Sequence, residues 1–266
     1  TGGEPLVRRG CVEFLAALKK IDGLKDISLT TNGILLEEYA QRIFDAGITR
    51  INISLDSLDK DKYYKITNGG NLDAVLRGII RADEIGFSPI KINTVLIKGF
   101  NDDEALDFAR LAVEKPFQIR FIELMPMGKT KLDYGEDYMP ASQLIEKISK
   151  RFELEPLKGK KNKSDGPARI FKIKGGQGEI GFINPVSEHF CATCNRLRLT
   201  SDGKLRACLL NEAEIDLKKA LRENCSDEEL EKLIWDAVLL KPKKHDVVCT
   251  DNSLKKCSRI MSEIGG

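Results

Sequence analysis

Three cysteines in the last third of the chain have the spacing of metal ligands. Cys191 and Cys194 form a Cys-x2-Cys pair, and Cys208 follows fourteen residues later. A structural zinc site uses four protein ligands, whereas a [4Fe-4S] cluster held by three cysteines leaves one iron open to a substrate. His189 is the nearby candidate for a fourth ligand, but it lies only two residues before Cys191. The spacing therefore favours an iron-sulfur cluster over zinc, and a redox dithiol would leave Cys208 without a role.

Two arginines lie inside this cysteine segment. Arg196 and Arg198 alternate along a sequence typical of a β-strand, so we expect their side chains to leave by the same face. Neighbouring guanidinium groups bind polyphosphates well because each presents several charged donors. Alternatively, the two arginines are ordinary surface charges with no shared ligand. Their position beside the cysteines favours the binding of a phosphorylated ligand.

A glycine pair lies near the start of the chain, in Thr-Gly-Gly-Glu-Pro (residues 1–5). Glycine lets the backbone approach a ligand closely and offer its amide groups. At the end of a parallel strand this segment predicts a cofactor contact.

Short β-rich runs alternate with amphipathic stretches up to about residue 127. We predict strands at 27–30, 50–55, 90–97 and 118–124, with helices at 36–44, between Asn71 and Gly86, and from 102 onward. This alternation implies a parallel sheet covered by helices. Ligands of such sheets bind where the carboxyl ends of the strands meet.

The pattern changes after residue 127. We predict a helix at 141–151, a charged loop at 158–166, an antiparallel hairpin of 168–173 and 179–183, and a helix from a capping box at Ser226 to residue 240. The chain is therefore interpreted as two domains, residues 1–127 and 128–266.

Composition sets limits on location and partners. The 266 residues include 43 basic and 41 acidic side chains, so no global charge favours nucleic acid or an anionic membrane. Apolar runs long enough to cross a membrane are absent, and we expect a cytoplasmic protein if the source is prokaryotic. The sequence begins with Thr1, so organellar targeting stays open.

Seven unevenly spaced cysteines argue against a disulfide framework. Cys11 and Cys225 are interpreted as small apolar residues of the core, and Cys249 and Cys257 receive no role.

Five segments together resemble the GTP 3′,8-cyclase family of molybdenum cofactor biosynthesis, within the radical S-adenosylmethionine (radical SAM) superfamily. They are TGGEPL, LTTNG, INISLD, IRFIELM and FCxxCNRLRLTxDGKLRxCL. The resemblance covers essentially the whole chain. It implies an α/β fold: a partial (β/α)6 TIM-like barrel that lacks its first βα unit, followed by a C-terminal extension of antiparallel strands and helices.

The resemblance also implies site residues. The positions at the S-adenosylmethionine site are Gly3, Ser54 and Met125. The positions at the GTP site are Thr30, Lys91, Arg196, Leu197 and Arg198. The ligands of an auxiliary [4Fe-4S] cluster are Cys191, Cys194 and Cys208. Arg120 is a candidate for orienting substrate, a structural ion pair being the alternative, and Gly265 and Gly266 match a slim tail that runs towards the pocket.

The reaction implied by the resemblance converts GTP and S-adenosylmethionine to 3′,8-cyclo-7,8-dihydroguanosine 5′-triphosphate. A second [4Fe-4S] cluster cleaves S-adenosylmethionine, and the resulting 5′-deoxyadenosyl radical takes hydrogen from the ribose. Its Cys-x3-Cys-x2-Cys motif is not in this sequence. We therefore expect these residues to be the carboxyl-terminal portion of a longer protein and to be inactive alone.

Implied partners are an electron donor, the next pathway enzyme (cyclic pyranopterin monophosphate synthase) and a second copy of the chain in a homodimer. Two alternatives stay open: another radical SAM enzyme with an auxiliary cluster, such as one that modifies peptides, and a zinc-bearing interaction module. The arginine pair favours a phosphorylated substrate over a peptide.

Overall fold

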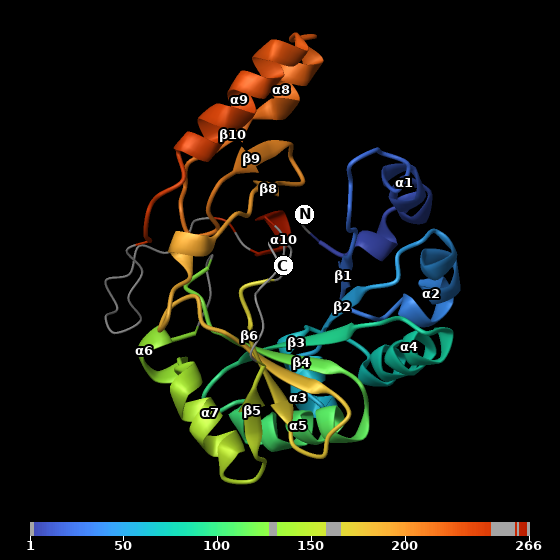
Figure 1. Ribbon diagram of the computed structural model, residues 1–266, viewed down its shortest axis with the longest axis vertical. Helices are drawn as coiled ribbons and strands as arrows, with labels where there is room; N and C mark the ends of the chain where they lie inside the picture. The colour runs from blue at the N-terminus through green and yellow to red at the C-terminus, as the bar shows by residue number, and fades with distance from the viewer. Residues whose placement is uncertain (1–2, 128–131, 158–165, 246–258, 260, 265–266) are drawn as a thin grey trace. The chain divides into compact units, whose positions relative to one another are not determined.

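A computed structural model describes residues 3–127, 132–157, 166–245, 259 and 261–264 of the chain. These residues form two compact units (Figure 1). Unit 1 comprises residues 1–3, 125–136 and 186–266, and unit 2 comprises residues 4–124 and 137–185.

Unit 2 is built on a mostly parallel sheet in the order β1-β2-β3-β4-β7-β6-β5. The strands are β1 Leu29–Thr31, β2 Ile51–Ser54, β3 Ile90–Leu96, β4 Gln118–Glu123, β5 Leu154–Pro156, β6 Arg169–Ile173 and β7 Glu179–Ile183. Neighbouring strands from β1 to β4, and β4 with β7, pair in parallel, whereas β7-β6 and β6-β5 pair antiparallel. This α/β arrangement is consistent with the expected partial barrel.

Helices connect and cover these strands. They are η1 Pro5–Val7, α1 Cys11–Leu18, α2 Leu36–Asp45, α3 Lys60–Ile66, α4 Leu72–Ile85, η2 Asp102–Glu104, α5 Ala105–Glu114 and α7 Ala141–Ser149. Asn71 caps α4 by accepting a hydrogen bond from Ala74 N at 3.2 Å, and Gly86 ends it with a φ of 98°. Both predicted boundaries of this helix are confirmed.

The strands bury alternate residues. Along β3, Ile90, Ile92 and Thr94 are buried while Lys91 and Asn93 between them are half-buried. Alternate side chains of a strand point to opposite faces, so one face of the sheet packs on the helices and the other is polar. The polar face is the part of the fold that can hold a ligand.

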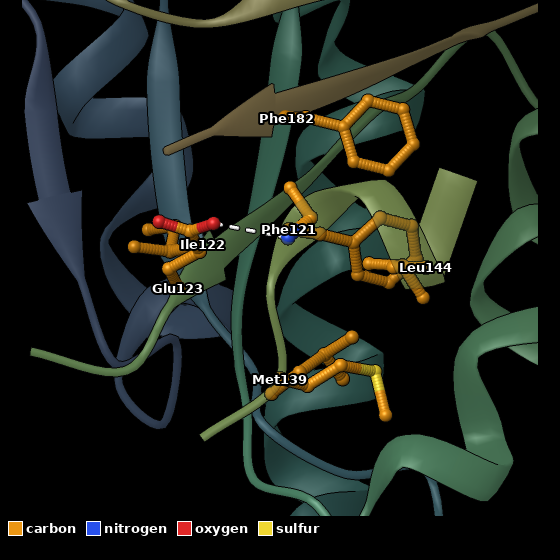
Figure 2. A pocket seen from close by; sticks show the side chains of 8 residues that line it. Phe121, Ile122, Glu123, Met139, Leu144 and Phe182 are labelled. Atoms are coloured by element: carbon orange, nitrogen blue, oxygen red, sulfur yellow. Dashed lines mark hydrogen bonds between the residues drawn. The ribbon is translucent and has the colours of Figure 1, made fainter. Parts of the chain in front are cut away.

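A hydrogen bond connects the start of helix α7 to the helix-covered side of β4. Glu123 Oε1 accepts a hydrogen bond from Ala141 N at 2.9 Å, which satisfies a free amide at the start of α7 (Figure 2). Phe121 and Phe182 stack beside it with ring centroids 5.9 Å apart, and Leu144 of α7 packs on the same cluster.

The predicted hairpin forms, and it does more than was expected. Strands β6 and β7 pair antiparallel, but β7 also pairs in parallel with β4. Ile180 and Phe182 of β7 are almost fully buried, so the strand completes the core of unit 2. The described residues 137–157 and 166–185 therefore belong to unit 2, and the expected division of the chain into domains of residues 1–127 and 128–266 stays a prediction.

Unit 1 contains a small antiparallel sheet and short helices. Its elements are η3 Cys191–Thr193, β8 Arg198–Leu199, β9 Lys204–Arg206, β10 Ile215–Asp216, α8 Leu217–Arg222, α9 Asp227–Leu239 and α10 Met261–Ile264, and α6 Tyr134–Asp137 begins in it. The strand order is β10-β9-β8. The predicted capping box of Ser226 and Glu229 is present at the start of α9. None of the helices that the structure describes is long and apolar enough to cross a membrane.

Candidate active site

Polar side chains form a row across the sheet of unit 2. Thr30, Asn52 and Lys91 occupy matching positions on β1, β2 and β3. All three are half-buried, and Asn52 Nδ2 donates to Thr30 Oγ1 at 3.4 Å. Matching positions on parallel strands point to the same face, so the structure brings the predicted residues Thr30 and Lys91 to one surface, with Asn52 between them.

A second row lies two residues further along the strands. Ser54, Asn93 and Arg120 match on β2, β3 and β4. The Oδ1 atom of Asn93 is buried and accepts no hydrogen bond within the described residues. A buried oxygen of this kind is normally satisfied, so it offers an acceptor to a ligand. Arg120 Nε donates to Gln118 Oε1 at 2.6 Å, which holds its guanidinium over the same face.

Asn52 and Asn93 are two polar residues of this face that the sequence analysis did not predict. The signal that could have found them is the alternation in Ile-Asn-Ile-Ser (residues 51–54) and Ile-Lys-Ile-Asn (residues 90–93). In both runs the polar residues share one face of a strand. That Asn52 and Asn93 share a face with each other depends on how β2 and β3 pair, and the sequence alone does not reveal this register.

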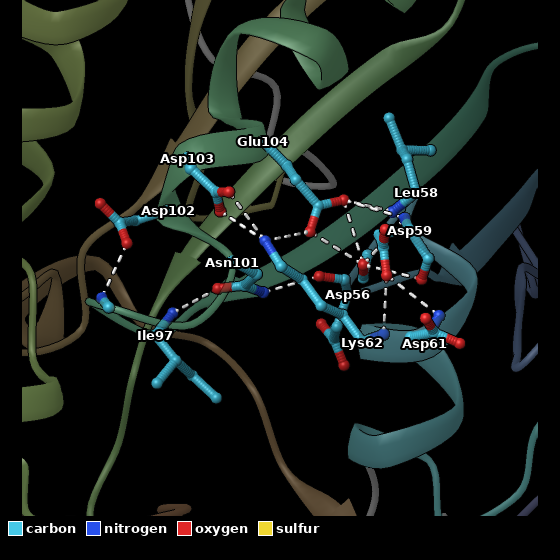
Figure 3. Close-up of polar contacts among 12 residues, drawn as sticks. Asp56, Leu58, Asp59, Asp61, Lys62, Ile97, Asn101, Asp102, Asp103 and Glu104 are labelled. Carbon is cyan, nitrogen blue, oxygen red and sulfur yellow. Dashed lines mark hydrogen bonds and ion pairs between the residues drawn. The ribbon is translucent and has the colours of Figure 1, made fainter.

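The loop after Ser54 is held by a buried carboxylate. Glu104 is 7% exposed and accepts hydrogen bonds from Ser57 Oγ at 2.9 Å and Leu58 N at 2.6 Å (Figure 3). Lys62 Nζ lies 3.3 Å from the same carboxylate. The fully buried Asn101 adds a bond from its Nδ2 to the carbonyl oxygen of Asp56 at 2.6 Å. These contacts fix the backbone just beyond Ser54.

Asp56 lies at the carboxyl end of β2, inside this network. Burial raises the pKa of its carboxyl to about 6, although the hydrogen bond that Val95 N donates to Oδ1 acts in the opposite direction. The residue therefore changes charge close to neutral pH, beside the predicted ligand contact Ser54.

Glu4 contacts the end of β1 through its carboxylate. Its carboxylate accepts hydrogen bonds from Thr31 Oγ1 at 2.7 Å and Asn32 N at 2.6 Å. Gly3 has a φ of 63°, a left-handed conformation that favours glycine. Gly3 and the half-buried Met125 belong to unit 1, whereas Ser54 belongs to unit 2. That these three residues meet at one S-adenosylmethionine site stays a prediction.

The cysteine segment lies in unit 1. Cys191 starts η3, Cys194 N donates to Cys191 O at 3.2 Å, and Cys208 follows the end of β9. All three thiols are half-buried. Burial raises the pKa of Cys194, but hydrogen bonds from Arg196 and its positive charge outweigh this and lower the pKa below its ordinary value. A lowered pKa favours the thiolate, the form that binds metals.

Arg196 and Arg198 lie beside these thiols. β8 starts only at Arg198, yet Arg196, Arg198 and the exposed Leu197 between them keep the expected alternation of exposure. Arg196 stacks over Phe190 at 4.8 Å from the ring centroid. Burial and the charge of Arg196 lower the pKa of Arg198. Among the described residues neither guanidinium forms an ion pair with a carboxylate, so two adjacent positive charges are available to an anion.

The described residues do not gather three metal-binding side chains around one point. No three His, Cys, Asp or Glu side chains in the described ranges lie close enough together to hold one metal ion. His189 instead packs edge-on against His245, with ring centroids 5.6 Å apart. Cys194 and Cys208 both act electrostatically on Arg198. An iron-sulfur cluster takes each cysteine on a different iron, so its ligands need not converge on one point.

Comparison with known proteins agrees with this arrangement. Residues 1–112 match the model of the radical SAM superfamily, and residues 117–247 match the model described as Molybdenum Cofactor Synthesis C. Together, the mostly parallel α/β sheet and these matches define a radical SAM enzyme, a class that uses a [4Fe-4S] cluster and S-adenosylmethionine.

Two relatives make the assignment more specific. The GTP 3′,8-cyclase of Alkaliphilus oremlandii is 48% identical over 267 residues, and that of Moorella thermoacetica is 50% identical over 266 residues. Each alignment covers 100% of this chain and 80% of the relative. The chain belongs to the GTP 3′,8-cyclase family, whose members act in the first step of molybdenum cofactor biosynthesis. A solved radical SAM methyltransferase from Sphaerobacter thermophilus aligns with a TM-score of 0.44 and 17% identity, over 56% of this chain and 45% of that one.

Several predicted positions lie outside the described residues. They are Gly2 of the glycine pair, residues 158–165 of the expected charged loop, Cys249, Cys257, Gly265 and Gly266.

Proposed function

We propose that this chain binds GTP between an auxiliary [4Fe-4S] cluster on Cys191, Cys194 and Cys208 and basic side chains that neutralise the triphosphate. The observation that carries the proposal is the Arg196 and Arg198 pair, adjacent to the cysteines and without a carboxylate partner among the described residues. Two partly desolvated guanidiniums repel each other, and a bound polyphosphate removes that repulsion. The open iron of the cluster would supply a Lewis-acid contact to the guanine.

The polar face of unit 2 supports the other half of the proposal. Lys91 is a cation for the phosphates, and Thr30 is a hydrogen-bonding group in the same row. Ser54, in the second row, is the residue for S-adenosylmethionine, together with Gly3 and Met125. Glu104 would support the binding of S-adenosylmethionine by keeping the loop that follows Ser54 in one conformation.

The test is GTP binding to the reconstituted chain, measured by equilibrium dialysis under anaerobic conditions. Arg198→Ala should weaken GTP about 10- to 100-fold, the effect of losing one charge-assisted contact of about 1.4–2.8 kcal/mol. The same variant should leave guanosine binding unchanged, because guanosine carries no phosphate. Arg222→Ala, at an exposed arginine of α8, is the matched control and should bind GTP like the parent.

The alternatives predict different outcomes. A zinc-bearing interaction module would take up stoichiometric zinc with no iron-sulfur absorption, and Cys194→Ala would not change nucleotide affinity. A peptide-modifying enzyme would bind members of a peptide panel and not GTP. Equal loss of GTP and guanosine affinity in Arg198→Ala would contradict the role given to the arginines.

The expected partners stay proposals. The pathway requires an electron donor and an enzyme that consumes the product. We also propose a homodimer and, for a prokaryotic source, a cytoplasmic location.

A further inference from the structure

One carboxylate in unit 1 bridges three basic side chains. Glu214 Oε1 lies 2.6 Å from Arg206 Nη1 and 2.7 Å from Arg259 Nε. Lys204 Nζ lies 3.4 Å from Oε2 of the same carboxylate. The Glu214 side chain is 14% exposed and that of Arg206 is fully buried. Charges removed from water to this extent hold their partners in place, because a broken pair leaves an uncompensated charge.

Through Arg206, this network contacts the loop that carries Cys208. Arg206 is the last residue of β9 and lies two residues before the cysteine. Its Nη2 donates to the carbonyl oxygens of Leu209, at 3.5 Å, and Asn211. The guanidinium of Arg206 therefore contacts the backbone just after Cys208. The backbone of Arg206, at the end of β9, fixes the chain just before Cys208. The conformation of this loop depends on where Arg206 is held.

On the other side, the network holds the described end of the chain. Arg259 Nη2 lies 2.9 Å from Asp202 Oδ2, in the turn between β8 and β9. Glu263 O accepts a hydrogen bond from Ser201 Oγ at 3.4 Å in the same turn. Ile264 is fully buried. Arg259 and Glu263 thus join this segment to the β8–β9 turn by an ion pair and a backbone contact, and Arg259 also pairs with Glu214.

We propose that Glu214 couples the docking of this C-terminal segment to the conformation of the Cys208 loop, which makes Arg259 a positioning residue for the third cluster ligand. The role of Cys208 as a ligand rests on the proposed function, whereas the coupling itself does not. Without Arg259, the Glu214 carboxylate loses one of the two guanidiniums that orient it, and its hold on Arg206 loosens. Coupling of this kind is reciprocal, so a cluster bound at Cys208 should also stabilise the docked segment.

The first test uses the metal-free chain and needs no cluster. Arg259→Gln should raise the alkylation rate of Cys208 by iodoacetamide about three- to tenfold, the range that one partly buried ion pair spans. Cys191 and Cys225, followed in the same samples by mass spectrometry, should react at unchanged rates. Arg222→Gln, at an exposed arginine with no ion pair in the described part of unit 1, should change none of the three.

Two results would overturn the coupling. An unchanged Cys208 rate would show that Arg259 does not act on the loop. An equal rise at Cys191, Cys208 and Cys225 would show that the network stabilises unit 1 as a whole and has no particular effect on Cys208. Asp202→Asn provides a second variant, since it removes the charge of the outer partner of Arg259 and leaves Glu214 in place, and it should give a smaller rise confined to Cys208.

The second test measures the reciprocal effect on the reconstituted chain. Cluster loading should slow amide hydrogen exchange in residues 259–264 of the parent, and Arg259→Gln should abolish that slowing and shorten the half-life of the cluster absorbance. Exchange that is unaffected by loading in the parent would contradict the coupling. If the parent takes up no iron, the proposed function fails, and the alkylation rates still decide the coupling.

Discussion

At the scale of single residues, Asp56 shows what burial does to a carboxyl group. Its raised pKa of about 6 means that the folded protein binds this proton more tightly than the unfolded chain does, where the ordinary value is 3.8. Protonated Asp56 therefore stabilises the fold fully below about pH 4, and the contribution is lost as pH rises through about 6.

Asp56→Asn should remove this pH dependence. Relative to the parent, the variant should gain unfolding free energy as pH rises from 4.5 to 7.5, by about 2 kcal/mol. Urea unfolding at three pH values measures the difference. Asp61→Asn, at an exposed carboxylate of α3, is the control, and a similar pH trend in both variants would contradict the assignment to Asp56.

Residue type and spacing were enough to identify Cys191, Cys194, Cys208, Arg196 and Arg198 as candidates, because all lie in one short segment. The same reasoning could not find Asn93 or Glu214. Asn93 acquires its role from its register with Ser54 and Arg120 on other strands. Glu214 acquires its role from Arg259, 45 residues away in the sequence.

At the scale of elements, helices α2 and α4 approach closely because of two glycines. A Cβ at Gly78 would lie 2.7 Å from the carbonyl oxygen of Gly33 and 2.9 Å from Leu36 Cβ. Gly33 itself has a φ of 80°. The periodicity of apolar residues predicted both helices, but it carries no information about how near they lie.

Gly78→Ala should destabilise unit 2 by about 1–3 kcal/mol, since the added methyl group meets backbone atoms that cannot rotate away. The better helix propensity of alanine offsets only part of this. Ile80→Ala, at a 55% exposed position of the same helix, should change stability by less than about 0.5 kcal/mol. Thermal unfolding compares the two, and equal stability of Gly78→Ala and the parent would show that the helices can move apart.

At the scale of the whole molecule, the two units differ in how they are stabilised. Unit 2 has an extensive apolar core drawn from its sheet and helices. Among the described residues of unit 1, a small apolar cluster contains Leu205, Leu217 and Ala237, with Ile215, Leu230 and Leu233 packed against it. A unit with little buried apolar surface depends more on ion pairs and on any bound metal. Alternating strands and helices predicted the sheet of unit 2, whereas the short strands of unit 1 carry too few residues for a clear pattern.

Metal loading should therefore protect the two units unequally. We expect amide exchange in residues 204–240 to slow when the cluster is reconstituted and to return to its initial rate after chelation. Residues 51–123 should exchange at the same rate in both states, and they serve as the internal control. A uniform change across both ranges would show that the cluster stabilises the chain globally.

The outermost strand of the sheet has a consequence for behaviour at high concentration. β5 forms one edge of the seven-stranded sheet, with only three residues. Its last residue, the exposed Pro156, has no N–H to donate. An edge this short, and interrupted by proline, is a poor template for a strand from another molecule. The residue that ends β5 therefore hinders edge-to-edge association at this side of the sheet.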